Sequence, residues 1–211
     1  MEHSKLLDPD DRARNRDERE AAIAAMISLP QFPCVGAKSA LARDNLKVIA
    51  GHSLDSNWDD LEIHRELLDW AREYRDSTGG LRSLAVIFDG PLNLSEAEFE
   101  NLLWARIQSL ADKDAWLGQD YDSRVSSDPG DPHFSLSFGG EAFFVIGLHP
   151  NASRPARRFA FPMLVFNLHD QFERLREQGN YEKMRDTILA RDLKLAGDIN
   201  PMLSKYGQAS E

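Results

Sequence analysis

Apolar residues recur every three or four positions over several long stretches of the chain, which predicts amphipathic helices. Asp8 and Pro9 suit the cap and first turn of one helix, and Ser95 with Glu98 forms a capping box at the start of another. Gly179 is expected to divide the last stretch into two helices. The expected helices cover residues 8–28, 34–41, 55–74 and 170–191, together with one that opens at Ser95 and buries Phe99, Leu102, Leu103, Ile107 and Leu110.

Shorter apolar runs bounded by turn-forming residues predict strands between these helices. Two of the runs flank Gly139 and Gly140, a pair typical of a tight hairpin turn. The expected strands cover residues 46–50, 84–88, 134–138, 142–148 and 164–166, with a long polar loop over residues 118–132. This order of elements predicts an α+β fold, a single domain whose central mixed, mostly antiparallel sheet is flanked by helices.

The N-terminal residues differ in composition from the rest of the chain. We interpret residues 1–29 as an N-terminal helical arm, charged and solvated at first and packed on the domain from Ala21 onward, and residues 30–211 as the domain itself. In the helix over residues 55–74, the expected apolar stripe is Leu61, His64, Leu67, Leu68 and Ala71. The tryptophans are expected mostly in the core or in helix packing: Trp58, Trp70, Trp104 and Trp116.

The formal net charge of the 211-residue chain is −10. A chain of this charge repels nucleic-acid phosphates and anionic lipids, so we expect no nucleic-acid or membrane partner, whereas a small cationic molecule would be favoured. The one cysteine, Cys34, excludes an intrachain disulfide and suits a reducing compartment. Because the N-terminus is densely charged and the longest apolar run, residues 142–148, is too short to cross a bilayer, we expect a cytoplasmic protein.

The sequence lacks the short motifs that mark several common enzyme classes. It contains no Gly-x-Gly dinucleotide fingerprint, no P-loop, no Gly-x-Ser-x-Gly nucleophile elbow and no His-Glu-x-x-His metal motif. These absences remove the best-marked hypotheses but do not exclude an enzyme.

Four stretches of the chain resemble the YqcI/YcgG family of bacterial proteins, in the same order as in that family. They are residues 32–37 (FPCVGA), 138–158 (FGGEAFFVIGLHPNASRPARR), 162–176 (PMLVFNLHDQFERLR) and the pair 191–192 (RD) with 200–203 (NPML). The family includes the haem-dependent N-hydroxylase of guanitoxin biosynthesis, which acts on a guanidine group. The resemblance therefore implies a haem-dependent oxygenase that N-hydroxylates a guanidine or a similar small nitrogenous substrate, with peroxide or an external electron donor completing the cycle.

Within this resemblance, Cys34 and His149 are the alternative iron ligands. A thiolate ligand favours O–O cleavage, and Cys34 precedes an expected helix whose free N–H groups would stabilise a thiolate. His149 ends an apolar strand, and a neutral imidazole is also a good haem ligand. The structural alternatives are an ordinary buried cysteine and a histidine bound to backbone at a turn. The sequence leaves the choice of ligand open.

The matched stretches supply further polar side chains for such a site. Arginines bind carboxylates as fork donors, so the haem propionates are expected to bind Arg154, Arg157 and Arg158. His169 and Asn167 follow another strand and are expected near the reacting atoms, although each also suits a structural role. A guanidinium substrate needs a carboxylate partner, for which Glu141 and Glu173 are the candidates, with Asp170 nearby; a surface ion pair is the alternative for Glu173.

Two other functions stay open from the sequence. The first is a non-haem metalloenzyme, because two histidines and a carboxylate such as His149, His169 and Glu173 form a known iron-binding arrangement. The second is a non-catalytic haem-binding or sensor protein, which would bind haem without turning over a substrate.

Overall fold

The structure, a computed structural model, describes residues 9–76 and 79–198. Residues 200–203 of the fourth matched stretch lie outside them. The helices are α1 (Pro9–Ser28), α2 (Val35–Ala42), α3 (Asp60–Asp76), α4 (Glu96–Trp116), α5 (His169–Glu177) and α6 (Tyr181–Ala196), with a 3₁₀ turn η1 (Pro155–Arg157). The strands are β1 (Leu46–Gly51), β2 (Ser83–Phe88), β3 (Leu136–Phe138), β4 (Glu141–Leu148) and β5 (Met163–Leu168).

The strands form one five-stranded sheet in the order β1-β2-β5-β4-β3. β1 and β2 are parallel, and the other neighbouring pairs are antiparallel. The hairpin between β3 and β4 turns at Gly139 and Gly140, whose φ angles of 60° and 78° favour glycine. The expected α+β fold, with a mixed and mostly antiparallel sheet flanked by helices, is therefore confirmed.

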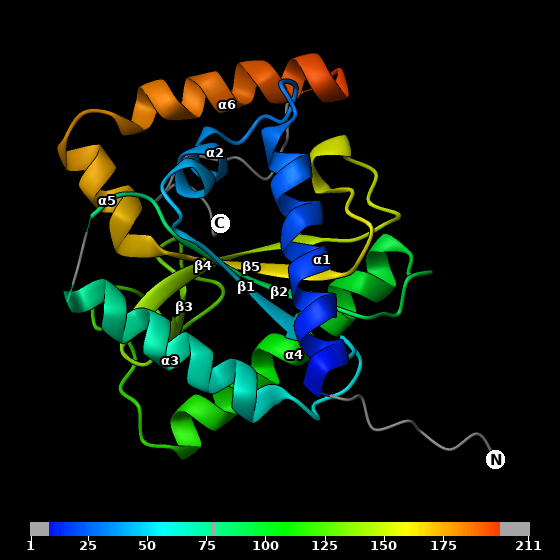
Figure 1. The fold of residues 1–211 in the computed structure, drawn as a ribbon. Helices are drawn as coiled ribbons and strands as arrows, with labels where there is room; N and C mark the ends of the chain where they lie inside the picture. Colours follow the sequence, from blue (N-terminus) through cyan, green and yellow to red (C-terminus); the bar gives the residue numbers. More distant parts are fainter. Residues whose placement is uncertain (1–8, 77–78, 199–211) are drawn as a thin grey trace.

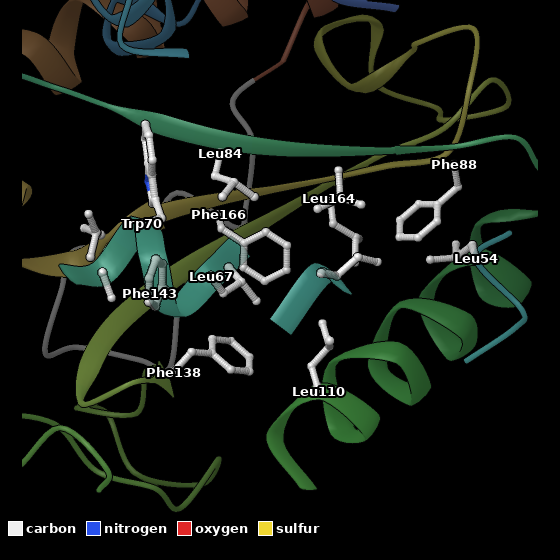
Figure 2. Close-up of a cluster of buried hydrophobic side chains, with 14 of the residues drawn as sticks. Leu54, Leu67, Trp70, Leu84, Phe88, Leu110, Phe138, Phe143, Leu164 and Phe166 are labelled. Carbon is white, nitrogen blue, oxygen red and sulfur yellow. The ribbon is translucent and has the colours of Figure 1, made fainter. Parts of the chain in front are cut away.

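Side chains alternate between the two faces of the sheet, and each face has its own helical layer (Figure 1). On one face, which we call the Phe166 face, Leu84, Val86, Leu164 and Phe166 pack with residues of α3 and α4. Figure 2 shows this cluster, in which Leu67 and Trp70 of α3 and Leu110 of α4 lie between these helices and the sheet residues Leu84, Phe143 and Phe166. These side chains are almost completely buried, so this layer is a well-sealed apolar core.

The opposite face, which we call the Cys34 face, carries a second apolar cluster. Ala85, Ile87, Leu148 and Met163 of the sheet are buried there, together with residues of α1 and of the segment that leads into α2. Other members of the same cluster are only half-buried, namely Cys34, Ala37, Leu41, Leu46, Ile146, Phe161 and Val165. The Cys34 face is therefore less completely covered than the Phe166 face.

Helix α1 is anchored to the Cys34 face as the apolar pattern of its second half predicts. Ile23 and Ile27 are buried, whereas Arg16 and Glu18 are exposed. Arg19 is also buried, which the charged sequence around it does not indicate. Its guanidinium donates to the Ile87 carbonyl oxygen at 2.9 Å and pairs with Asp89, so a charged side chain fixes α1 to the end of β2. The proposed boundary at residues 29 and 30 stays a prediction.

The structure corrects two expectations about apolar side chains. Leu61 is 62% exposed, because the buried stripe of α3 runs through Ile63, Leu67, Trp70 and Tyr74, and Leu61 lies almost opposite Ile63 on the helix. Most of the tryptophans are also outside the core: Trp58, Trp104 and Trp116 are exposed, and Trp70 alone of the four is buried. Helix α3 begins at Asp60, five residues later than expected, and the Asp59 side chain just before it accepts a hydrogen bond from the His52 amide.

Among the described helices, none is both long enough and apolar enough to span a membrane.

Candidate functional site

Cys34 is the N-cap residue of α2, at the helix start that the sequence predicts. Its Sγ accepts a hydrogen bond from the Ala37 amide at 3.4 Å, which fixes the direction of the side chain. The side chain is half-buried within the cluster of the Cys34 face. The thiol therefore combines a fixed position with partial access to solvent, as a ligand or reactive group requires.

Arg157 lies in η1, and its guanidinium interacts electrostatically with the Cys34 thiol. The thiol and the carboxylate of Asp192 both act electrostatically on its guanidinium, and burial lowers the pKa of Arg157 below its ordinary value. Within the described part of the chain, the Arg157 guanidinium forms no hydrogen bond or ion pair. It is a half-buried cation that has no anion bound directly to it among the described residues.

The two neighbouring arginines already have partners. Arg154 donates to Asp192 of α6 at 2.6 Å and to Asp198 at 2.9 Å. Arg158 donates to the backbone oxygens of Ala152 and Ser153, at 2.6 and 2.8 Å. Of the three arginines expected to bind propionates, Arg157 is thus the one without a bound partner in the described chain. Arg154 and Arg158 instead bind other parts of the chain.

His149 lies on the opposite side of the sheet from Cys34. Its ring stacks on Phe99 of α4, with ring centroids 4.4 Å apart and an interplanar angle of 15°. Gly147, two residues earlier, faces the same way, since a Cβ atom there would meet the Phe99 ring at 2.6 Å. His149 is 4% exposed, and Nδ1 of its imidazole has no hydrogen-bond partner in the described chain. Cys34 and His149, the alternative iron ligands expected from the sequence, therefore lie on different faces of the sheet and cannot line one pocket.

Burial lowers the pKa of His149, and the nearby Glu96 carboxylate partly opposes this effect. The histidine is consequently neutral at neutral pH. A neutral imidazole could bind a metal, but the Phe99 ring covers one side of it and the α4 layer encloses it.

His169 lies at the other end of the β4–β5 pair from His149. The strand register pairs Leu148 with Met163 next to His149, and Phe143 with Leu168 next to His169. Five residues of strand separate the two ends, which corresponds to about 17 Å. Among the described residues, no group of three or more His, Cys, Asp or Glu side chains is placed to hold a metal ion. The structure therefore does not assemble His149, His169 and Glu173 as a non-haem metal centre.

His169 makes packing and electrostatic contacts with neighbouring side chains of the chain. Its ring packs against Phe144 at a centroid distance of 4.7 Å, and its Nε2 lies 3.5 Å from Oε1 of Glu173. Burial lowers the pKa of His169, with the Glu173 carboxylate opposing this. Glu173 also pairs with Arg176. Glu173 thus forms a surface ion pair, the alternative to substrate binding that the sequence leaves open.

Glu141 binds arginines of the chain itself. Arg124 donates to its Oε2 at 2.8 Å, and Nη1 of Arg75 lies 3.5 Å from its Oε1. The same Arg124 guanidinium bonds to Asp122 at 2.6 Å and to Asp170 at 3.2 Å. Glu141 and Asp170, two of the carboxylates expected near a guanidinium substrate, therefore already hold the guanidinium of Arg124 from the polar loop. No sequence motif marks Arg124, because two of its three partners, Glu141 and Asp170, lie on distant elements.

Asn167 lies on the Cys34 face at the end of β5. Its Oδ1 accepts a hydrogen bond from the Ser83 hydroxyl at 2.6 Å, and both side chains are buried. This bond crosses the β2–β5 pair and satisfies the buried amide oxygen. Asn167 therefore has a structural partner that the sequence does not reveal, although it shares a face with Cys34.

A shallow, open groove lies along one face of α6, lined by Lys183, Asp186, Thr187, Ala190, Arg191 and Lys194. None of the residues expected to bind a cofactor or substrate lines it. The groove is therefore separate from the polar groups around Cys34.

The sequence model of the YqcI/YcgG family matches residues 23–211 of the chain. The chain belongs to the YqcI/YcgG family. No curated protein and no solved structure matches this YqcI/YcgG protein. The family match begins within α1 and includes Ile23 and Ile27, the residues through which α1 packs on the Cys34 face.

Proposed function

We propose that this YqcI/YcgG protein binds haem through Cys34 and oxidises a small nitrogenous substrate, a guanidine or a similar compound. The observation that carries the proposal is the relation between Cys34 and Arg157. A half-buried thiol with a fixed direction interacts electrostatically with a half-buried guanidinium that has no anion bound to it among the described residues.

The residues around Cys34 fit a haem group in their chemistry. A thiol is one of the side chains that ligate haem iron, and a guanidinium is suited to a propionate carboxylate. The half-buried apolar side chains of the same cluster, among them Ile146, Phe161 and Val165, are suited to the apolar surface of a porphyrin. His149 fits less well, because its imidazole is enclosed and stacked on Phe99.

On this proposal, Cys34 ligates the iron and Arg157 binds a propionate. When bound, haem supplies the activation of dioxygen or peroxide that hydroxylation of a nitrogen atom needs. Arg154 has a supporting role, because its bonds to Asp192 and Asp198 join the segment that carries Arg157 to α6. The substrate class rests on the family resemblance, and neither Glu141 nor Glu173 is proposed to bind it.

Hemin titration of the full-length protein tests the proposal, with Cys34→Ser as the nearly isosteric variant and Arg158→Gln as a matched arginine control. We expect a saturable Soret band for the wild type and a changed Soret band for Cys34→Ser. We also expect the reduced, CO-bound spectrum to lose its thiolate character in Cys34→Ser and to keep it in Arg158→Gln. Absence of a Soret band in the wild type, or an unchanged spectrum in Cys34→Ser, would overturn the proposal.

A turnover assay then separates an enzyme from a haem-binding sensor. Hemin-loaded protein is incubated with arginine and related guanidines, with either peroxide or a reductant and dioxygen. We expect a product that has gained one oxygen atom, detected by mass spectrometry. Haem binding without any such product across the guanidine series would support the non-catalytic function instead.

A further inference from the structure

His149 belongs to a segment that joins the two sides of the sheet. After β4 the chain runs through residues 149–159, which we call the linking segment, before returning to β5. The His149 amide donates to the Arg157 carbonyl oxygen at 3.1 Å, and the His149 carbonyl oxygen accepts from the Ala152 amide at 3.3 Å. His149 and Arg158 also form an isolated β-bridge. The backbone of His149 thus closes the loop that carries Arg157.

Three contacts hold the linking segment to the start of α4. The His149 ring stacks on Phe99, and the Asn151 side chain donates to the Leu94 carbonyl oxygen at 3.0 Å. Glu96 accepts bonds from the amide and hydroxyl of Ser153, at 2.9 and 2.7 Å. These contacts all involve residues at the start of α4. Arg157, in η1 near the end of the linking segment, instead interacts electrostatically with Cys34.

The contacts of the His149 ring favour packing over chemistry. A catalytic or ligating imidazole needs a nitrogen that faces an open site, whereas Nδ1 of His149 is buried and the Phe99 ring covers one face of the imidazole. The ring instead makes an offset face contact with Phe99, an interaction of about 1 kcal/mol that an aromatic ring of similar size could replace.

We infer that His149 is a positioning residue, which fixes Arg157 beside Cys34 by clamping the linking segment against Phe99. This inference rests on the proposed function, because it gives Arg157 a ligand to hold. Through Arg157, the start of α4 on the Phe166 face controls the geometry of a site on the Cys34 face.

The test compares His149→Ala with His149→Phe, which keeps an aromatic ring on Phe99 and removes both ring nitrogens. We expect His149→Ala to weaken hemin binding about tenfold, as loss of an outer-shell support does, and His149→Phe to restore most of the affinity. Failure of His149→Phe to restore binding would show that an imidazole nitrogen is needed, and would overturn the inference.

A double-mutant cycle with Arg157→Ala identifies the route of the effect. If His149 acts through Arg157, His149→Ala should cause little further loss of hemin affinity in the Arg157→Ala background. An undiminished loss in that background would contradict positioning through Arg157.

Hydrogen exchange of the hemin-free protein keeps this test separate from the proposed function. We expect the amides of the linking segment to exchange faster in His149→Ala and at the wild-type rate in His149→Phe. Wild-type protein that binds no hemin but shows this exchange pattern would overturn the proposed function and leave the clamp in place. Unchanged exchange in His149→Ala would overturn the clamp itself.

Discussion

The two faces of the sheet differ in how completely they are covered, and adjacent residues of β5 show the difference. Phe166 is completely buried between the sheet and the α3–α4 layer, whereas Val165, on the other face, is half-buried. Most apolar side chains of the Phe166 face are completely buried, among them Leu84, Val86, Leu164 and Phe166. The Cys34 face leaves part of its apolar surface and a thiol accessible, and on our proposal this is where the chemistry takes place.

Truncating these two neighbouring residues gives the largest expected contrast. Phe166→Ala removes a ring from a sealed core and should lower the free energy of unfolding by about 4 kcal/mol. Val165→Ala removes half-buried methyl groups and should cost about 1 kcal/mol. Urea denaturation followed by circular dichroism measures both values. Equal losses would show that the two faces are packed alike.

Buried arginines provide the next contrast. Arg106 of α4 has a completely buried side chain that pairs with Asp59 at 2.9 Å and with Asp60. Arg106→Gln leaves these carboxylates without their main partner and should cost about 3 kcal/mol. Arg154 on the other side is 18% exposed in its side chain, so Arg154→Gln should cost about 1 kcal/mol. Thermal unfolding that ranks Arg154→Gln as the more damaging change would contradict this order.

Removing the N-cap of α4 should have a smaller effect on stability, and it tests how the layer on the Phe166 face supports the linking segment. Ser95 and Glu98 form the complete capping box that the sequence predicts. Ser95→Ala should lower the free energy of unfolding by about 1 kcal/mol. Because α4 supports the linking segment, we also expect faster hydrogen exchange at residues 149–159, with no change in β1. An unaltered unfolding midpoint would show that the cap is not needed.

Lowering the pH should reduce the free energy of unfolding, because of the two buried histidines His149 and His169. Burial lowers the pKa values of His149 and His169, so their imidazoles stay neutral in the folded chain while those of the unfolded chain take up protons. The unfolded state then binds more protons, and stability falls as the pH drops below about 6.5. We expect urea midpoints measured from about pH 7.5 to about 5.5 to decline less steeply in His149→Phe than in the wild type. Parallel curves would contradict a neutral, buried His149.

The apolar periodicity of the sequence predicts the fold well, because burial against one layer imposes a regular spacing on each element. The capping box at Ser95, the break at Gly179 and the hairpin at Gly139–Gly140 all lie where local geometry requires those residue types. The burial of the tryptophans is not predicted correctly, because a residue's type alone does not determine whether it is buried. Trp104 and Trp116 lie off the row of α4 that faces the sheet.

The candidate site is less predictable, because its members meet across the fold. Strand alternation places His149 opposite Ile146 and Leu148, but no pattern in the sequence says which face α2 covers. The pairing of Glu141 with Arg124 joins β4 to a polar loop, and nothing in either segment specifies the other. Residue type could therefore nominate Cys34, His149 and Arg157, and only the three-dimensional arrangement separates the histidine from the other two.

Hydrogen exchange of the full-length protein, with and without hemin, tests most directly whether the site lies on the Cys34 face. We predict that hemin slows exchange in residues 34–42, 144–148 and 155–165 and leaves the amides of α3 and of residues 99–110 unchanged. Slower exchange confined to α3 and α4 would instead place the bound group beside His149 and Phe99, and would contradict the account.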